Sequence, residues 1–170
     1  MSAVQALLKR RPSTLRVLSA SGQLGYGIPH KALAAGLARN PDFIGCDMGS
    51  VDPGPAYLGS GEMATSPAVT RGDLADVLTA ARRLNIPLII GTAGTSGAGP
   101  HLDATLDMIR SIAAEHNLHF RLAAIRADLK ADRVIQALNA NTLVPLGGDL
   151  SVSAEAVSYT HLTLPTKRIV

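Results

Sequence analysis

Hydrophobic positions along the chain follow two spacings, which alternate from segment to segment. The clearest helical spacing lies in residues 74–81, where apolar residues recur at i, i+3, i+4 and i+7. The clearest strand is the unbroken apolar run of residues 87–90, which is typical of a strand buried on both faces. Segments of both kinds recur, and the predicted strands are residues 15–18, 43–47, 87–90 and 119–125, with helices that begin near residues 29, 70, 100 and 131.

Local signals support three of these helix starts. Pro29 and Pro100 suit the first turn of a helix, where a missing N–H costs nothing. Thr70 is followed three residues later by Asp73, a spacing that resembles a capping box. We therefore expect a helix to begin at each of these positions.

Strand, glycine-rich turn and helix follow one another four times. This order predicts an α/β fold with an open, mostly parallel sheet and helices on both faces, built from Rossmann-like βα repeats over residues 1–150. Right-handed crossovers place every strand-to-helix turn at one edge of such a sheet. Ligands bind outside that edge. Three loops should converge there, namely residues 19–27, 47–62 and 91–101.

Composition narrows the class of protein. Hydrophobic residues make up 46% and charged residues 17% of the 170 residues, which indicates a folded chain. The formal charge of +3 is dispersed, so nucleic acid is not expected as a partner. No apolar stretch approaches the ~20 residues that cross a bilayer, so no membrane is expected either. One cysteine and no signal-peptide pattern favour a cytoplasmic protein.

Residues 157–170, VSYTHLTLPTKRIV, differ in character from the rest of the chain. They have no helical period, and Pro165 interrupts their alternation. The stretch resembles the translation of a transposase adapter used in short-read sequencing libraries. We therefore expect a non-native tail, with residues up to about 156 forming the N-terminal part of a longer protein.

The loop at residues 47–62, DMGSVDPGPAYLGSGE, follows a short apolar strand and holds little that favours a helix. Its length predicts a functional loop, and the alternative is a surface loop without chemistry. Asp47 ends the strand and is the candidate catalytic acid or base. The candidate ligand-binding residues of this loop are Ser50, Asp52, Gly54 and Tyr57.

The loop at residues 91–101, GTAGTSGAGPH, runs directly into a helix. Successive N–H groups and a helix N-terminus together form an anion site, suited to a phosphate, a carboxylate or a coenzyme A diphosphate. His101 is the second candidate catalytic residue, as a general acid or base. Flexible turns and a polar first-turn histidine are the alternatives. The candidate ligand-binding residues here are Gly94, Thr95, Ser96 and Gly97.

The loop at residues 19–27 resembles a degenerate dinucleotide-binding turn. Ser21, Gly22 and Gly25 are its candidate ligand-binding residues, and Asp47 could hold a ribose. Tight turns without a cofactor explain the same glycines equally well. No zinc-binding spacing is present, so no metal site is expected and the cofactor stays open.

A family resemblance rests on three stretches of the chain. They are VLSASGQLGYG, DMGSVDPGPAYLGSGE and the segment from PLIIGTAGTSGAGPH to LAAIRAD. Over residues 16–149 it resembles the acyclic terpene utilisation (AtuA-like) family. The wider family often has an acid where Tyr26 stands here. The resemblance implies a bacterial, cytoplasmic, catabolic protein acting on branched isoprenoid acyl substrates, with coenzyme A thioesters the expected form.

The reaction stays open at this point. A lyase, a hydratase or another acyl-coenzyme A-processing enzyme would fit the resemblance. A nucleotide (NAD(P))-dependent oxidoreductase and a non-catalytic ligand-binding subunit are the two alternatives. An anionic or acyl small molecule is the expected partner, and the oligomeric state is open, a homo-oligomer included.

Overall fold

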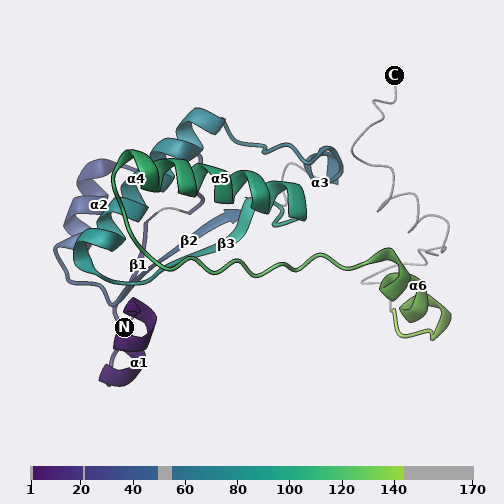
Figure 1. Cartoon of the computed structure of the whole chain (residues 1–170), viewed down its shortest axis with the longest axis horizontal. Helices are drawn as coiled ribbons and strands as arrows, with labels where there is room; N and C mark the ends of the chain where they lie inside the picture. The colour runs from purple at the N-terminus through teal and green to yellow at the C-terminus, as the bar shows by residue number, and fades with distance from the viewer. Residues whose placement is uncertain (1, 21, 50–54, 144–170) are drawn as a thin grey trace.

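The computed structural model describes residues 2–20, 22–49 and 55–143 (Figure 1). Helices and strands alternate through most of this part of the chain. In order they are α1 (Ala3–Arg10), β1 (Val17–Ser19), α2 (His30–Leu37), β2 (Phe43–Gly49), α3 (Pro55–Ser60), α4 (Pro67–Leu84), β3 (Leu88–Thr95), α5 (Gly99–Glu115) and α6 (Ala131–Asn139).

The three strands form one parallel sheet in the order β1-β2-β3. Ile44 of β2 pairs with Leu18 on one side and with Leu88 on the other. Helices α2 and α4 supply the crossovers between successive strands. The prediction of an α/β fold with a parallel sheet is therefore confirmed.

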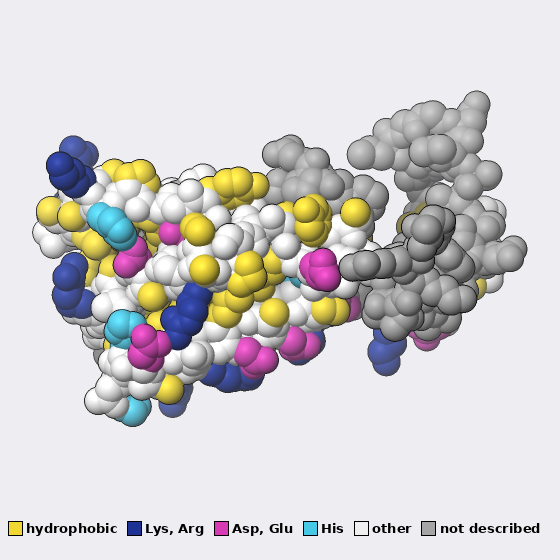
Figure 2. All heavy atoms as spheres, turned by 90° about the horizontal axis from the view of Figure 1, so that it is seen from above, with side chains coloured by type: hydrophobic (Ala, Val, Ile, Leu, Met, Phe, Trp, Pro, Cys, Tyr) yellow, Lys and Arg dark blue, Asp and Glu magenta, His cyan; other side chains and the backbone are white. Residues whose placement is uncertain are grey.

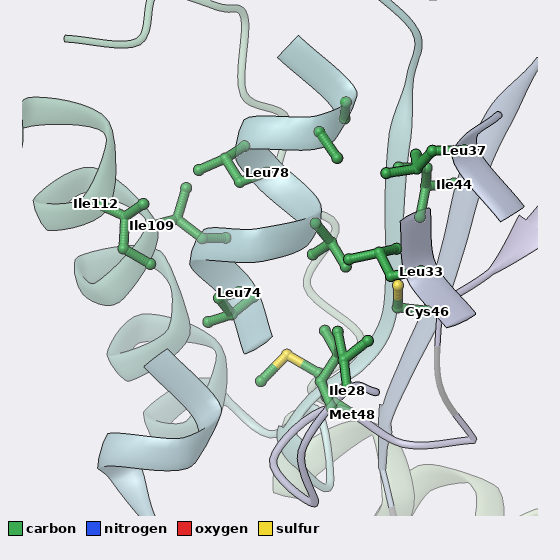
Figure 3. Close-up of a cluster of buried hydrophobic side chains, with 14 residues drawn as sticks. Ile28, Leu33, Leu37, Ile44, Cys46, Met48, Leu74, Leu78, Ile109 and Ile112 are labelled. Atoms are coloured by element: carbon green, nitrogen blue, oxygen red, sulfur yellow. The ribbon is translucent and has the colours of Figure 1, made fainter. Parts of the chain in front are cut away.

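The hydrophobic core lies between one face of this sheet and the helices (Figure 3). Alternate residues of β2 point into it, so that Ile44, Cys46 and Met48 are buried while Asp47 is exposed. Leu74 of α4 belongs to the same cluster, and the helical spacing seen in the sequence thus marks a true core face. The core is aliphatic, in keeping with the low aromatic content of the chain.

The opposite face of the sheet is not covered in the same way. Val17 and Ile89, whose side chains alternate with the core positions, are each 56% exposed. Helices α2, α4 and α5 all contribute to the one core, whereas we expected helices on both faces. The expectation rested on the repeated order of strands and helices, together with the apolar run of residues 87–90, and neither fixes the face of the sheet on which each helix packs.

The fourth strand expected at residues 119–125 is not formed. Residues 118–130 are extended and run past β3 in Figure 1, but they form no ladder with it. Leu118 and Phe120 at its start pack against the core, whereas Leu122 is 45% and Ile125 is 89% exposed, so the described residues leave the apolar side chains further along it uncovered. Strand-like composition alone was therefore insufficient to predict strand pairing. Below, residues 118–130 are called the extended segment.

Helix α1 was not predicted, although its signal is visible in the sequence. The Ser2 hydroxyl accepts the Gln5 N–H, and the Gln5 side chain accepts the Ser2 N–H, which makes a capping box. At its far end, Arg10 pairs with Asp42, which also accepts the N–H of Arg16 at 2.7 Å. The hydrogen bond from Arg16 is the main reason why the pKa of Asp42 lies below its usual range.

Figure 2 looks down on the helical side of the molecule. Lys and Arg side chains lie apart from one another on this face and are interspersed with acidic side chains. The dispersed charge of the sequence is therefore dispersed on this surface too. Within the described residues, no helix combines the length and the apolar content that crossing a membrane requires.

Candidate functional site

The end of β3 departs from regular strand geometry. Asp47 pairs with Gly91 and Gly49 with Thr95, so four steps along β3 face two steps along β2. The extra residues bulge, and φ is positive at Thr92 (48°), Gly94 (70°) and Thr95 (97°). A β-branched residue at such a φ is an outlier, and outliers of this kind cluster at functional sites. The bulge is therefore the first physical sign of a site here.

Gly94 brings this bulge against helix α5. A Cβ atom at Gly94 would lie 2.6 Å from the carbonyl oxygen of His101, which is a clash with backbone. Only glycine allows so close an approach at this positive φ. The residues that follow, Thr95 and Ser96, are thereby held next to the first turn of α5.

His101 lies in that first turn and is fully buried. Its Nδ1 is 2.5 Å from Oγ of Ser96, and its Nε2 is 2.9 Å from the carbonyl oxygen of Glu62. A carbonyl oxygen can only accept, so Nε2 carries the proton, and in the neutral ring Nδ1 is free to accept the Ser96 hydroxyl proton. The ring thus joins a hydroxyl to a backbone carbonyl.

This arrangement has three parts that nucleophilic catalysis requires. Ser96 supplies the hydroxyl, His101 the base, and the Glu62 carbonyl fixes the tautomer and the orientation of the ring. Ser96 is half-buried rather than enclosed, so part of this residue is exposed to solvent. The N–H of Ala98 lies 3.4 Å from the same Oγ.

The segment that provides the Glu62 carbonyl is fixed to β3. The Thr95 side chain is buried, and its Oγ1 accepts the N–H of Ala64 at 2.9 Å. The strained Thr95 therefore connects the loop after α3 to the bulge. The Glu62 side chain itself is exposed and takes no part in the contact with His101.

The expected anion site at the start of α5 already holds a carboxylate of the chain. Asp128, in the extended segment, accepts the N–H of Gly99 at 2.7 Å. Arg126 of the same segment pairs with Asp103 of α5. The helix N-terminus therefore binds an internal anion, and the extended segment is attached to α5 at two points.

The N–H groups of the first glycine turn, near residues 19–27, also bind a carboxylate of the chain itself. Asp73, buried in α4, accepts the N–H groups of Gly25, Gly27 and Ile28 at 2.8 to 3.0 Å. These are donors that a dinucleotide phosphate would need. Gly22, in contrast, is exposed and has open space around it.

Asp73 and Thr70 do not form the capping box that their spacing suggested. Helix α4 begins at Pro67, after Ser66, so both residues lie within the helix and both are buried. Thr70 shares a hydrogen bond with the hydroxyl of Thr65. The capping-box prediction is therefore wrong, and Asp73 instead accepts hydrogen bonds from the first glycine turn.

Asp47 and His101 do not come together. Asp47 lies on the uncovered face of the sheet, whereas His101 belongs to α5 on the covered face. The Asp47 carboxylate accepts the N–H of Gly49, two residues on, at 2.9 Å. Asp47 therefore shapes the end of β2 and is not the partner of the buried histidine.

The long loop contains a helix that its composition did not suggest. Helix α3 includes Tyr57, which is half-buried and whose carbonyl accepts the N–H of Gly61 at 3.0 Å. Four candidate ligand-binding residues lie outside the described residues, namely Ser21, Ser50, Asp52 and Gly54. The other four candidates of the loop at residues 91–101 lie in the bulge at the end of β3 and in the turn after it. They are Gly94, Thr95, Ser96 and Gly97.

Across residues 2–20, 22–49 and 55–143, no three His, Cys, Asp or Glu side chains gather closely enough to hold a metal ion. The groups gathered at Ser96 are a hydroxyl, an imidazole and backbone groups. Comparison of the chain with family models, with curated proteins and with solved structures finds no match.

Proposed function

We propose that this chain is an enzyme, or part of one, that transfers or hydrolyses an acyl group, with Ser96 as the nucleophile and His101 as the base. One observation carries the proposal, which is that His101 is buried between the Ser96 hydroxyl and the Glu62 carbonyl. A buried histidine needs hydrogen-bond partners, but a structural role does not require that one of them be a reachable hydroxyl.

The chemistry follows from these contacts. Nδ1 of His101 takes the Ser96 proton while Oγ forms a bond to the acyl carbon. The bond from that carbon to the leaving sulfur or oxygen breaks, and the leaving group takes the proton back from Nδ1. A water molecule then attacks the acyl carbon and gives a proton to Nδ1, the bond from Oγ to that carbon breaks, and Oγ takes the proton from Nδ1 as the free acid leaves. The Glu62 carbonyl accepts from Nε2 throughout and stabilises the ring while it is positively charged.

The Ala98 N–H can stabilise part of the negative charge that develops on the acyl oxygen of the substrate. It lies 3.4 Å from Ser96 Oγ, near the place where the oxygen of a bound acyl group would sit. A preorganised N–H of this kind stabilises an oxyanion in acyl transfer. Its contact with the hydroxyl is long, so little is lost when the N–H donates to the substrate instead.

Acyl chemistry also agrees with the resemblance to the AtuA-like family, which implies branched acyl thioesters as substrates. The nucleotide-dependent alternative receives less support, because Asp73 already accepts the N–H groups of Gly25, Gly27 and Ile28. A non-catalytic binding subunit would keep the same fold and show no turnover.

The test is hydrolysis of short acyl esters and of butyryl-coenzyme A by the chain and by Ser96→Ala. We expect the variant to lose turnover by about 10³-fold or more, since removal of a catalytic nucleophile has effects of this size. Ser111→Ala is the matched control, because Ser111 is an exposed serine on α5, the helix that carries His101. Equal rates in Ser96→Ala and the parent chain would refute the proposal.

A further inference from the structure

A groove of about 910 Å³ lies between helix α5, the free edge of β3 and the extended segment. Its inner wall consists of apolar side chains, among them Leu102 and Leu106 of α5 and Ala93 of β3, which form a hydrophobic cluster of their own. Phe120 and Leu122 of the extended segment form part of the outer wall. The groove exists because that segment runs beside β3 without pairing with it.

Ser96 and Gly97 line the same groove, at the end where β3 gives way to α5. The lining continues along β3 as far as Ile86 and Pro87, which precede the strand. Ser96, whose hydroxyl His101 contacts, therefore lies at one end of a long and mostly apolar groove. Ligand sites of about 300–1,000 Å³ with mostly apolar walls and a few polar groups are typical of small-molecule binding.

We propose that this groove binds the apolar chain of the acyl substrate, with the acyl carbonyl at Ser96. The assignment of the carbonyl end rests on the proposed function, whereas binding of the chain does not require that Ser96 react. The substrate class would be acyl esters or thioesters with long or branched hydrocarbon chains. Short acyl groups would react without filling the groove.

The wall at Leu122 offers a variant that leaves the core intact. Leu122 is 45% exposed and lines the groove, so Leu122→Glu places a carboxylate in the channel without removing a buried side chain. Leu129→Glu is the matched control, because Leu129 is in the same extended segment, is 68% exposed and is not part of the lining.

The experiment measures two quantities for each protein, after circular dichroism has shown equal folding. The first is the affinity for a fluorescent polyene fatty acid, and the second is the rate of p-nitrophenyl acetate hydrolysis. We expect Leu122→Glu to weaken fatty-acid binding by about tenfold or more, because a charge must be desolvated or the chain displaced. The acetate rate should stay within about twofold in Leu129→Glu, whose side chain is not part of the lining.

The two proposals fail in different ways. Loss of fatty-acid binding in Leu122→Glu, with normal binding in Leu129→Glu and in Ser96→Ala, supports the groove even when no ester is hydrolysed. Acetate hydrolysis that depends on Ser96, without fatty-acid binding by the parent chain, overturns the groove and leaves the proposed function standing. Equal weakening by both glutamate variants also overturns it.

Discussion

The Ser96 hydroxyl meets Nδ1 of the buried His101 at 2.5 Å, five residues along the chain. Two features make this contact possible. Gly94 lets the bulge at the end of β3 approach α5, and Thr95 holds the loop whose Glu62 carbonyl fixes the far side of the ring. The site therefore depends on backbone positions as much as on side chains, and the predictions test both.

The first prediction separates the Glu62 backbone from the Glu62 side chain. Glu62→Ala should keep the esterase rate within about twofold, because only the carbonyl contacts His101. Thr95→Val removes the acceptor for the half-buried Ala64 N–H, at a cost of about 1 kcal/mol. Its rate should fall more than that of Glu62→Ala. The reverse order of rates would show that the carboxylate matters instead.

The second prediction concerns the close approach at Gly94. Gly94→Ala should lower the free energy of unfolding by at least about 2 kcal/mol, because the new Cβ overlaps backbone and φ is positive. Urea denaturation measures the change. Gly22→Ala serves as the control and should stay within about 0.5 kcal/mol, since Gly22 has open space around it. Similar losses in both variants would contradict the proposed packing.

The third prediction tests the internal carboxylate of the first glycine turn. Asp73→Asn keeps the size of the side chain but replaces one carboxylate oxygen with an NH2 group. Three backbone N–H groups donate to this carboxylate, and a donor cannot accept from them. We expect a loss of about 2–4 kcal/mol in the free energy of unfolding. Asp107→Asn, at an exposed position of α5, should change it by less than about 0.5 kcal/mol. A neutral Asp73→Asn would mean that the turn does not depend on this carboxylate.

The fourth prediction uses the one cysteine. Burial raises the pKa of the Cys46 thiol above its usual range, so the folded chain holds this proton more tightly than the unfolded chain. Its contribution to stability is therefore fully present below the pKa of the unfolded thiol and is lost as pH rises through the folded value. Cys46→Ala should make the fall in stability at alkaline pH shallower than in the parent chain. Thermal melts at neutral and alkaline pH would show this, and identical slopes would contradict it.

The same burial predicts slow chemistry at this thiol. A thiol reagent should modify Cys46 in urea-unfolded protein and react far more slowly with the folded chain at neutral pH, because the thiolate is the reactive form.

The sequence was most informative where one short-range pattern decided the structure. The helical spacing of residues 74–81 became the core face of α4, and the parallel strands followed from the βα order. The Gly-rich turn before Pro100 was correctly expected to precede a helix. The pattern around residues 91–101 also predicts Ser96 and His101 as candidate site residues, and the two are in contact.

The remaining features depend on tertiary contacts. The spacing of Thr70 and Asp73 fits a cap, yet only the folded chain shows that Asp73 reaches across to the first turn. The Glu62 carbonyl is a backbone atom, which no residue pattern could single out. The extended segment has the composition of a strand, but composition does not decide pairing, and the described residues leave Leu122 and Ile125 largely uncovered.

The most direct test of the central proposal is covalent labelling of Ser96. The chain is incubated with a fluorophosphonate, which reacts with activated serine hydroxyls, and its intact mass is measured before peptide mapping. We predict one adduct per chain, located on Ser96, absent from Ser96→Ala and retained by Ser111→Ala. No adduct on the parent chain, or an adduct that persists in Ser96→Ala, would contradict the assignment of Ser96 and His101 as a catalytic pair.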